Sequence, residues 1–441
     1  MFVWQNDARI VSREKDWLAM PQHSFISIPL DIPNIRVTKT EITKSGDLLL
    51  TVESLLTSTT CHRCGQTITN RHGYDEPREL RHLPILGRPV YLRLRPKRFR
   101  CPHCDGHPTT TQQLDWYDPQ ALHTKAYEQH LLVALVNTTL QDVASKEDVS
   151  YDALLGILDR WMTTTVDWTT IEPFTTLGMD EIALRKGHRN FVAIMTAQTT
   201  SGRVQLLAVL PDRLKTTVSA WLMSIPEALR ERITTVCTDM WDGYVTAASH
   251  ILPGATIVID RFHVARHYRD AVDSLRKQEV RRLRTTLPKE EQSVLDKTLW
   301  PLRKAAADLT DDEQSRLDGL LALSVPLAHA YRLREELTTI FATADSKADA
   351  LQRIEQWREQ VNDSGVTCFA SFLKLLDSWQ DRITNYFHSR QTSGFVEGFN
   401  NKLKVLKRRC YGMTNTTRLF QRLTLDMARY RRFSRFSGAS Y

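Results

Sequence analysis

The chain has 441 residues, which is too long for one ordinary hydrophobic core, so two to four domains are expected. Hydrophobic residues make up 41% and charged residues 25%, a composition that excludes a disordered protein. The first twenty residues contain no uninterrupted apolar segment, and no later stretch approaches the roughly 20 apolar residues that a bilayer span requires. We therefore expect a cytoplasmic protein with no membrane segment.

The net charge of +8 arises from 59 basic and 51 acidic residues, and most of the excess lies near the C-terminal end. From Asn400 to Tyr441 there are eleven basic residues against one acid, Asp426. A second basic run spans Arg93 to Arg100. Clustered cations attract a phosphate backbone through counterion release, although the same clusters also occur on ordinary solvated faces. The distribution favours a nucleic-acid partner.

Four short segments with alternating apolar and polar residues predict a β-rich module within the first hundred residues: 25–30, 35–42, 47–54 and 90–99. Two Cys-x-x-Cys pairs, separated by 36 residues, lie within the module. This spacing is typical of zinc knuckles and predicts one structural Zn²⁺, with two unrelated turns as the alternative. The expected ligands are Cys61, Cys64, Cys101 and Cys104, while His62, His103 and His107 are possible substitutes or, more commonly, neighbouring residues.

From Pro119 the pattern changes to helix, with amphipathic segments at 121–137, 139–150 and 151–162. A tight break between Glu147 and Ser150 resembles the turn of a helix-turn-helix, whose last helix would run from Tyr151 to Trp161. The turn lacks the usual glycine, and Asp152 and Asp159 make the last helix acidic. A plain three-helix packing unit therefore stays open as the alternative.

After Pro173 the sequence predicts three consecutive strands, then a helix, a strand, a short helix and a fifth strand. That order is the order of the ribonuclease-H-like fold. Residues 263–388 are helical by composition and period, which predicts an all-helical insertion into this α/β core. The expected fold class is a multi-domain α+β chain with a zinc module (1–118), a helix-turn-helix (119–170), the catalytic core (171–264), the insertion (265–388) and the final core helix with a basic segment (389–441).

Three acids lie where this strand order would bring them together. Asp180 lies on the first strand, Asp239 ends the fourth, and Glu397 opens the last helix. Carboxylates suit magnesium, and phosphodiester transfer needs two hard divalent cations, one for the nucleophile and one for the leaving oxygen. Glu181 must point to the opposite face of its strand from Asp180. Asp260, at the end of the fifth strand, is the main alternative to Asp239.

The last predicted helix is amphipathic. Glu397 and Arg408 belong to its polar stripe, while Val396, Phe399 and Leu403 begin its apolar stripe. A solvated charged face would give the same pattern. If the polar stripe instead faces a cleft filled by DNA, the residues expected to bind nucleic acid are Asn401, Lys404, Lys407, Arg408 and Arg409.

Taken together, the segments GMDEI, VCTDMWDGY, VIDRFHVARH and SGFVEGFNNKLKVLKRRCYG resemble the ISL3 family of insertion-sequence transposases, and the resemblance covers nearly the whole chain. It implies that Asp180, Asp239 and Glu397 form the catalytic triad and hold two Mg²⁺ or Mn²⁺ ions. It also implies double-stranded DNA partners, namely terminal inverted repeats and target DNA, and a homodimer on DNA. The implied reaction is hydrolysis at the element ends followed by attack of the freed 3′-hydroxyl on target DNA.

Two other functions stay open at this point. One is a catalytically inactive zinc and helix-turn-helix DNA-binding regulator derived from a transposase, and the other is a nuclease that cuts without joining DNA.

The role of Trp300 also has two interpretations. It is either a core residue of an amphipathic helix, the common case, or a surface on which an extruded base stacks.

Overall fold

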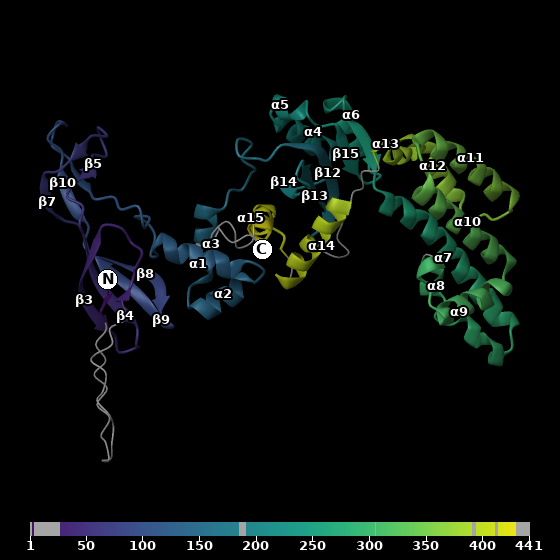
Figure 1. Cartoon of the computed structure of the whole chain (residues 1–441), viewed down its shortest axis with the longest axis horizontal. Coiled ribbons are helices and arrows are strands. Elements are labelled where there is room, and N and C mark those ends of the chain that lie inside the picture. Colours follow the sequence, from purple (N-terminus) through teal and green to yellow (C-terminus); the bar gives the residue numbers. More distant parts are fainter. Residues whose placement is uncertain are drawn as a thin grey trace, which may run out of the picture. The chain divides into compact units, whose positions relative to one another are not determined.

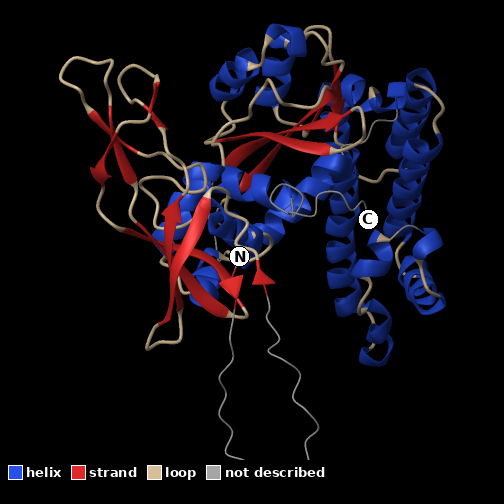
Figure 2. Cartoon of the chain, turned by 60° about the vertical axis from the view of Figure 1, so that its left-hand side comes forward, coloured by secondary structure: helices blue, strands red, loops and turns tan. Residues whose placement is uncertain are grey.

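The computed structural model describes residues 2–3, 27–184, 191–304, 306–389, 394–410 and 413–428. The chain divides into two compact units (Figures 1 and 2). The first comprises residues 1–161 with 428–441, and the second comprises residues 162–427. None of the helices described is both long and apolar enough to cross a membrane.

A four-stranded sheet forms the core of the first unit, with the order β3-β4-β9-β8. Leu50 and Leu92, which face each other in the parallel pair β4–β9, are fully buried. The predicted strand at 90–99 is split, because Arg95 and Pro96 separate β9 from β10. The sheet strands are β3 (Ile35–Ile42), β4 (Leu48–Ser54), β8 (Arg78–Ile85) and β9 (Arg88–Leu94).

Short strands carry the cysteine pairs in the same unit. β10 pairs with both β7 and β11, and β5 pairs with β6. A further small pair joins β1 (Phe2–Val3) to β2 (Ser27–Ile28). The other short strands are β5 (Thr59–Thr60), β6 (Thr67–Ile68), β7 (Arg71–Tyr74), β10 (Lys97–Arg100) and β11 (Thr109–Thr111).

Three helices complete the described part of this unit: α1 (Lys125–Leu135), α2 (Leu140–Glu147) and α3 (Tyr151–Trp161). Asp148 takes the left-handed conformation that ends α2, with φ of 50°, so an aspartate fills the position where glycine is usual. Ser150 caps α3 by accepting a hydrogen bond from the amide of Ala153 at 3.1 Å. The break therefore falls where the sequence predicts it.

The second unit contains a five-stranded sheet with the order β14-β13-β12-β15-β16. β12, β13 and β14 form an antiparallel meander, and β15 and β16 run parallel to β12. Helices lie between the later strands. The elements are β12 (Phe174–Ala183), β13 (Phe191–Thr199), β14 (Val204–Leu210), α4 (Lys215–Ser224), α5 (Glu227–Arg230), β15 (Thr235–Thr238), α6 (Asp242–Ile251) and β16 (Thr256–Ile259).

The two faces of this sheet have different neighbours. Leu177 and Met179 pack in the core that contains α4 and α6. Ile182 and Leu184 pack with helices α14 (Gly394–Arg409) and α15 (Thr416–Ala428). Because successive side chains of a strand alternate between faces, β12 presents odd-numbered residues to α4 and α6 and even-numbered residues to α14.

Residues 261–389 are helical apart from short connections, and they share one continuous core with the α4–α6 face of the sheet. The side-chain amide of Asn385 links these helices to the sheet by donating a hydrogen bond to the carbonyl oxygen of Ile257 at 2.8 Å. The elements are α7 (Arg261–Thr286), η1 (Lys289–Leu295), α8 (Leu299–Arg303), η2 (Ala306–Asp308), α9 (Asp311–Ala322), α10 (Val325–Thr343), α11 (Lys347–Asp363), α12 (Ala370–Thr384) and α13 (Tyr386–Ser389).

Candidate active site and zinc centre

Asp180 and Asp239 lie side by side: Asp180 is within β12, and Asp239 directly follows the neighbouring parallel strand β15. Met179 is paired with Thr238 in the register of β12 and β15, and each aspartate lies one residue further along its chain. Burial raises the pKa of the Asp180 carboxyl group, while the Glu181 amide, His263 and Asn400 oppose that rise. The structure therefore brings together two of the three predicted acids.

The carboxyl group of Asp239 is the less satisfied of the pair. Burial, and then the negative charges of Asp180 and Glu181, raise the pKa of Asp239 to about 7. Its Oδ1 atom is buried and has no hydrogen-bond partner among the described residues. A buried carboxylate oxygen without a donor is costly, and a bound cation would relieve that cost.

Asp260, the alternative to Asp239, has a structural role. Its side chain caps α7 by accepting a hydrogen bond from the amide of Phe262 at 2.8 Å. Its charge nevertheless raises the pKa of both Asp180 and Asp239, so it lies at the edge of the same cluster. Asp239 has the freer carboxylate of the two.

Helix α14 approaches β12 closely because residue 178 is glycine. A Cβ atom on Gly178 would lie 2.6 Å from the Val396 side chain and 2.9 Å from the Phe395 ring. One turn further along the helix, the side-chain amide of Asn400 donates a hydrogen bond to Oδ2 of Asp180. Asn400 is only 7% exposed, and its own Oδ1 is buried without a partner among the described residues.

Glu397 lies in α14, between Val396 and Asn400. Its side chain falls outside the described residues. Its backbone position is three residues before Asn400, and residues three apart share one face of a helix. The structure thus fixes the helix that carries the third predicted acid.

Glu181 faces away from Asp180, as the strand alternation predicts. Its carboxylate forms an ion pair with Arg213, which precedes α4. The Arg213 guanidinium also lies 3.8 Å from the centre of the Trp241 ring. This cation lowers the pKa of Asp239 and partly offsets the surrounding negative charge.

The four predicted zinc ligands meet at one point of the first unit. Cys61 and Cys64 lie between β5 and β6, whereas Cys101 and Cys104 lie between β10 and β11. All four sulfur atoms lie within 4.8 Å of one another. The Sγ–Sγ distance is 4.0 Å for Cys61–Cys104 and 3.7 Å for Cys64–Cys101. A tetrahedral site with Zn–S bonds of 2.3 Å has edges of about 3.8 Å, so the cluster fits zinc.

The nearby histidines have other contacts or lie at the surface. Nδ1 of His62 is 2.9 Å from the Thr110 hydroxyl oxygen, and Nδ1 of His107 is 3.1 Å from the Cys101 carbonyl oxygen. His103 is exposed. The cluster found among the described residues contains cysteines alone.

Comparisons with known proteins identify the family of the chain. A transposase family model of the ISL3 DDE type matches residues 177–423, which is more than half of the chain. The chain belongs to the ISL3 family of DDE transposases. A second model, the zinc finger of the IS204/IS1001/IS1096/IS1165 transposases, matches residues 57–104 of this transposase and includes all four clustered cysteines.

Curated relatives of this transposase agree with the family. The transposase of insertion sequence IS1001 from Bordetella parapertussis is 29% identical over 82% of this chain and 87% of its own length. The IS1557 transposase of Mycobacterium tuberculosis is 22% identical over 85% of this chain and 87% of its own length. The family therefore implies cleavage and transfer of nucleic-acid strands, and the cysteine cluster supports zinc binding.

The predicted DNA-binding side chains of α14 differ in their surroundings. Asn401, Lys404 and Arg408 are exposed. In contrast, the Lys407 ammonium group donates a hydrogen bond to the Ala183 carbonyl, and Arg409 lies 3.8 Å from a carboxylate oxygen of Asp426. Burial lowers the pKa of Lys407.

Sequence reasoning missed three residues of this site in the transposase: Gly178, His263 and Asn400. Asn400 directly precedes the predicted Asn401, and the paired asparagines were the available signal. Gly178 gave a weaker sequence signal, because a glycine inside a strand often marks a close approach of another element. His263 acts on Asp180 through charge, which the sequence alone does not reveal.

Proposed function

We propose that Asp180, Asp239 and Glu397 are the catalytic acids of this transposase and that they hold two Mg²⁺ or Mn²⁺ ions on a ribonuclease-H-like core. The observation that carries the proposal is the placement of Asp180, within β12, beside Asp239, which directly follows the adjacent parallel strand β15. Helix α14 is bonded to Asp180 through Asn400. The strand order 3-2-1-4-5 supports the core assignment. In this proposal the helical residues 265–388 are an insertion into that core.

The residues present fit divalent cations. Burial raises the pKa of both Asp180 and Asp239, and the negative charge of Asp260 adds to each rise. The buried Oδ1 of Asp239 has no hydrogen-bond partner among the described residues, so the site lacks a compensating positive charge. Carboxylates are the ligands that magnesium prefers. Bound metal would activate the attacking water or hydroxyl group and stabilise the leaving oxygen.

The remaining groups of the site position the acids. Asn400 holds Oδ2 of Asp180 and so fixes which way that carboxylate turns. Arg213 forms an ion pair with Glu181 on the opposite face of β12, so of these two adjacent acids Asp180 is the one that faces α14. Both cleavage of an element end and attack by its 3′-hydroxyl are in-line displacements at phosphorus, so one site can serve both steps in turn.

The other parts of the chain bind DNA in this proposal. The zinc module (1–118) and a helix-turn-helix (119–170) recognise the terminal inverted repeats, while Asn401, Lys404, Lys407, Arg408 and Arg409 contact phosphates beside the acids. Cleavage of paired ends requires a homodimer on DNA. Because the DNA of a bacterial element lies in the cytoplasm, the proposal places the protein there.

The decisive experiment is cleavage of a labelled element end by single-residue variants in magnesium. Asp180→Asn, Asp239→Asn and Glu397→Gln should each abolish cleavage and leave end binding intact. Asp242→Asn is the matched control, because Asp242 is an exposed acid in the first turn of α6, just past Asp239. Cleavage that survives any of the three test substitutions contradicts the assignment of that acid.

The same assay separates strand transfer from simple hydrolysis. A transposase yields a product in which the labelled 3′-end is joined to a second DNA, and a nuclease yields free ends alone. A chain that binds ends and never nicks them would instead be an inactive regulator, which the family match does not favour.

A further inference from the structure

A partly open cavity of about 640 Å³ is lined by residues of α7 and of α8 with the following Lys304. Two aromatic side chains line it, Phe262 from α7 and Trp300 from α8, and they are 50% and 65% exposed. The interpretation of Trp300 as a core residue is therefore wrong. Large aromatic rings are usually buried, so two exposed rings in one cavity indicate a flat, partly apolar ligand. We call this space the aromatic cavity.

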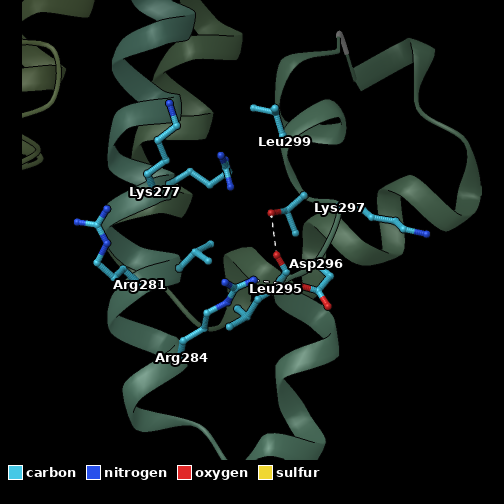
Figure 3. A pocket seen from close by; sticks show the side chains of 10 residues that line it. Lys277, Arg281, Arg284, Leu295, Asp296, Lys297 and Leu299 are labelled. Atoms are coloured by element: carbon cyan, nitrogen blue, oxygen red, sulfur yellow. Dashed lines mark hydrogen bonds and ion pairs between the residues drawn. The ribbon is translucent and has the colours of Figure 1, made fainter.

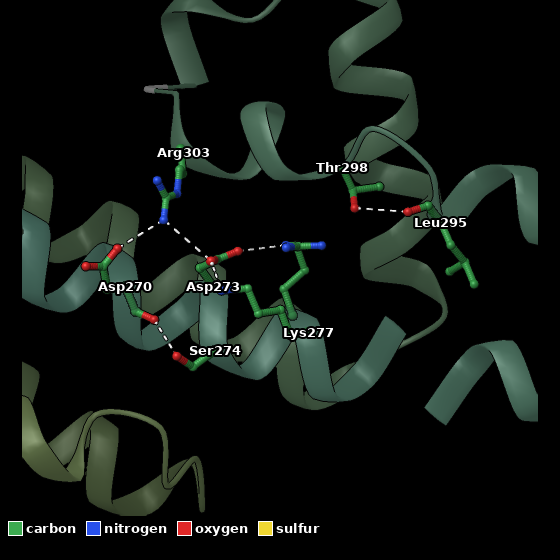
Figure 4. Close-up of polar contacts among 8 residues, drawn as sticks. Asp270, Asp273, Ser274, Lys277, Leu295, Thr298 and Arg303 are labelled. Atoms are coloured by element: carbon green, nitrogen blue, oxygen red, sulfur yellow. Dashed lines mark hydrogen bonds and ion pairs between the residues drawn. The ribbon is translucent and has the colours of Figure 1, made fainter. Parts of the chain in front are cut away.

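The charges around the aromatic cavity indicate an anionic ligand. Four cations line it, but only one acid, Asp270. Arg303 lies 3.0 Å from Asp270 and 3.4 Å from Asp273, and thus neutralises the acidic side of the cavity (Figure 4). Arg269 has no ion pair among the described residues, and its Nε atom is buried without a hydrogen-bond partner there. Its charge is available to a phosphate.

The aromatic cavity begins beside the acid cluster. Phe262 supplies the backbone amide that Asp260 caps, and the backbone amide of Asp260 donates to the carbonyl oxygen of Thr238 at 2.8 Å, one residue before Asp239. Two residues of a helix advance by only about 3 Å along its axis. A DNA strand that reaches the acids therefore passes close to Phe262.

A second cavity, of about 370 Å³, lies further along α7 and has a different character (Figure 3). It is lined by Arg281 and Arg284 from α7 and by Lys297 opposite them, with no aromatic side chain in its wall. Arg281 and Lys297 have no ion pair among the described residues. Such a surface suits the phosphates of a duplex but offers nothing on which a base could stack. We call it the basic cavity.

We propose that the aromatic cavity binds an unpaired nucleotide of the DNA that enters the active site, with its base against Trp300 and Phe262 and its phosphate against Arg269. Stacking of a base on an aromatic ring tolerates any sequence, because every base has a flat face. Binding there would hold an opened DNA end next to the acids. The inference rests on the proposed function only in taking DNA as the ligand.

The test compares two forms of one fluorescently labelled duplex, a blunt form and a form with a short single-stranded thymidine extension. The full-length chain is used without added magnesium, so cleavage does not enter the measurement. We expect tighter binding of the extended form. Trp300→Leu should weaken binding of that form about fivefold to a hundredfold and change the affinity for the blunt form little. Trp300→Phe should retain most of the preference.

Two further variants make the outcome decisive. Arg281→Ala, in the basic cavity, should weaken both forms equally, because it removes a phosphate contact from the duplex. Phe262→Leu should repeat the effect of Trp300→Leu if both rings stack on the base. Equal affinity of the wild type for the two forms, or a Trp300→Leu variant that keeps the preference, would overturn the inference. A wild-type chain that shows the preference but does not cleave element ends in magnesium would contradict the catalytic proposal alone.

Discussion

The carboxyl group of Asp239 is buried beside Asp180, Glu181 and Asp260, and its pKa is raised to about 7. Between the pKa of an unfolded aspartate, near 4, and this value, the folded chain holds a proton that the unfolded chain has released. The free energy of unfolding should therefore fall as the pH rises from about 4 to 7. Each pKa unit corresponds to about 1.4 kcal/mol, so the loss is on the order of a few kcal/mol without metal.

Asp239→Asn should remove this loss and abolish cleavage. We expect the melting temperature of the second unit at pH 8, without added magnesium, to be higher in the variant than in the wild type. The difference should shrink towards pH 5, where the wild-type carboxyl group is protonated. Melting curves of both chains at both pH values test this prediction. Equal melting temperatures at pH 8 would mean that the pKa of Asp239 is not raised in the folded chain.

Gly178 sets the distance between β12 and α14. In Gly178→Ala the new methyl group would meet the Thr196 hydroxyl at 2.6 Å as well as the side chains of Val396 and Phe395, so the first turn of α14 must shift. Such overpacking costs about 1–3 kcal/mol of unfolding free energy. The shift would also displace Glu397, so cleavage should fall more than end binding does.

Gly254→Ala is the matched control for Gly178→Ala, because no atom lies within 4 Å of a Cβ at position 254. It should leave both cleavage and stability nearly unchanged. Urea unfolding and end cleavage, measured on both variants, separate the two cases. A Gly178→Ala chain as stable and active as the wild type would show that α14 does not pack on β12 in the active form.

At the scale of elements, α14 combines two kinds of cation. Lys404 and Arg408 are exposed, whereas Arg409 is near Asp426. Lys404→Ala and Arg408→Ala should each weaken DNA binding and reduce the slope of log affinity against log salt by about 1, with little effect on stability. Arg409→Ala should lower the melting temperature as well as weaken DNA binding, because Arg409 also has a carboxylate partner. Salt titrations of DNA binding check this, and an unchanged slope for both exposed residues would contradict a DNA-facing α14.

The elements that the sequence predicted best are those with a clear hydrophobic period. The three consecutive strands predicted after Pro173 appear as β12, β13 and β14, because their apolar runs are long. β8 was missed, since RELRHLPI carries three basic or histidine side chains and a proline in eight residues. Its burial comes from pairing with β9, a contact between distant segments that local pattern does not reveal.

The candidate active site and the zinc cluster also combine features that local sequence patterns predict with contacts that they do not. The closeness of Asp180 to Asp239, and of the four cysteines to one another, was predictable because strand order and Cys-x-x-Cys spacing are sequence features. The bond from Asn400 to Asp180 and the capping role of Asp260 were not, because both depend on how a helix end meets a neighbouring strand. The distinction among the α14 cations likewise required their partners, Ala183 for Lys407 and Asp426 for Arg409.

At the scale of the whole molecule, the zinc cluster and the acids belong to different units of the chain. Four thiolates held around one ion stabilise a small module whose own core is limited. Cys101→Ser should therefore remove zinc and unfold the module, while the second unit keeps its fold. Two separate melting transitions are expected in the wild type, and only one of them should depend on zinc.

Loss of the zinc module should also separate recognition from chemistry. Cys101→Ser should lose preference for element ends over unrelated DNA, because its second unit retains only the phosphate-binding cations and the acids. Cys368→Ser is the control, since Cys368 is a partly buried cysteine of the second unit, outside the cluster. It should keep zinc and end preference. Competition binding with unrelated DNA and zinc analysis decide the point. A Cys101→Ser chain that has lost zinc and still selects element ends would assign recognition to the second unit.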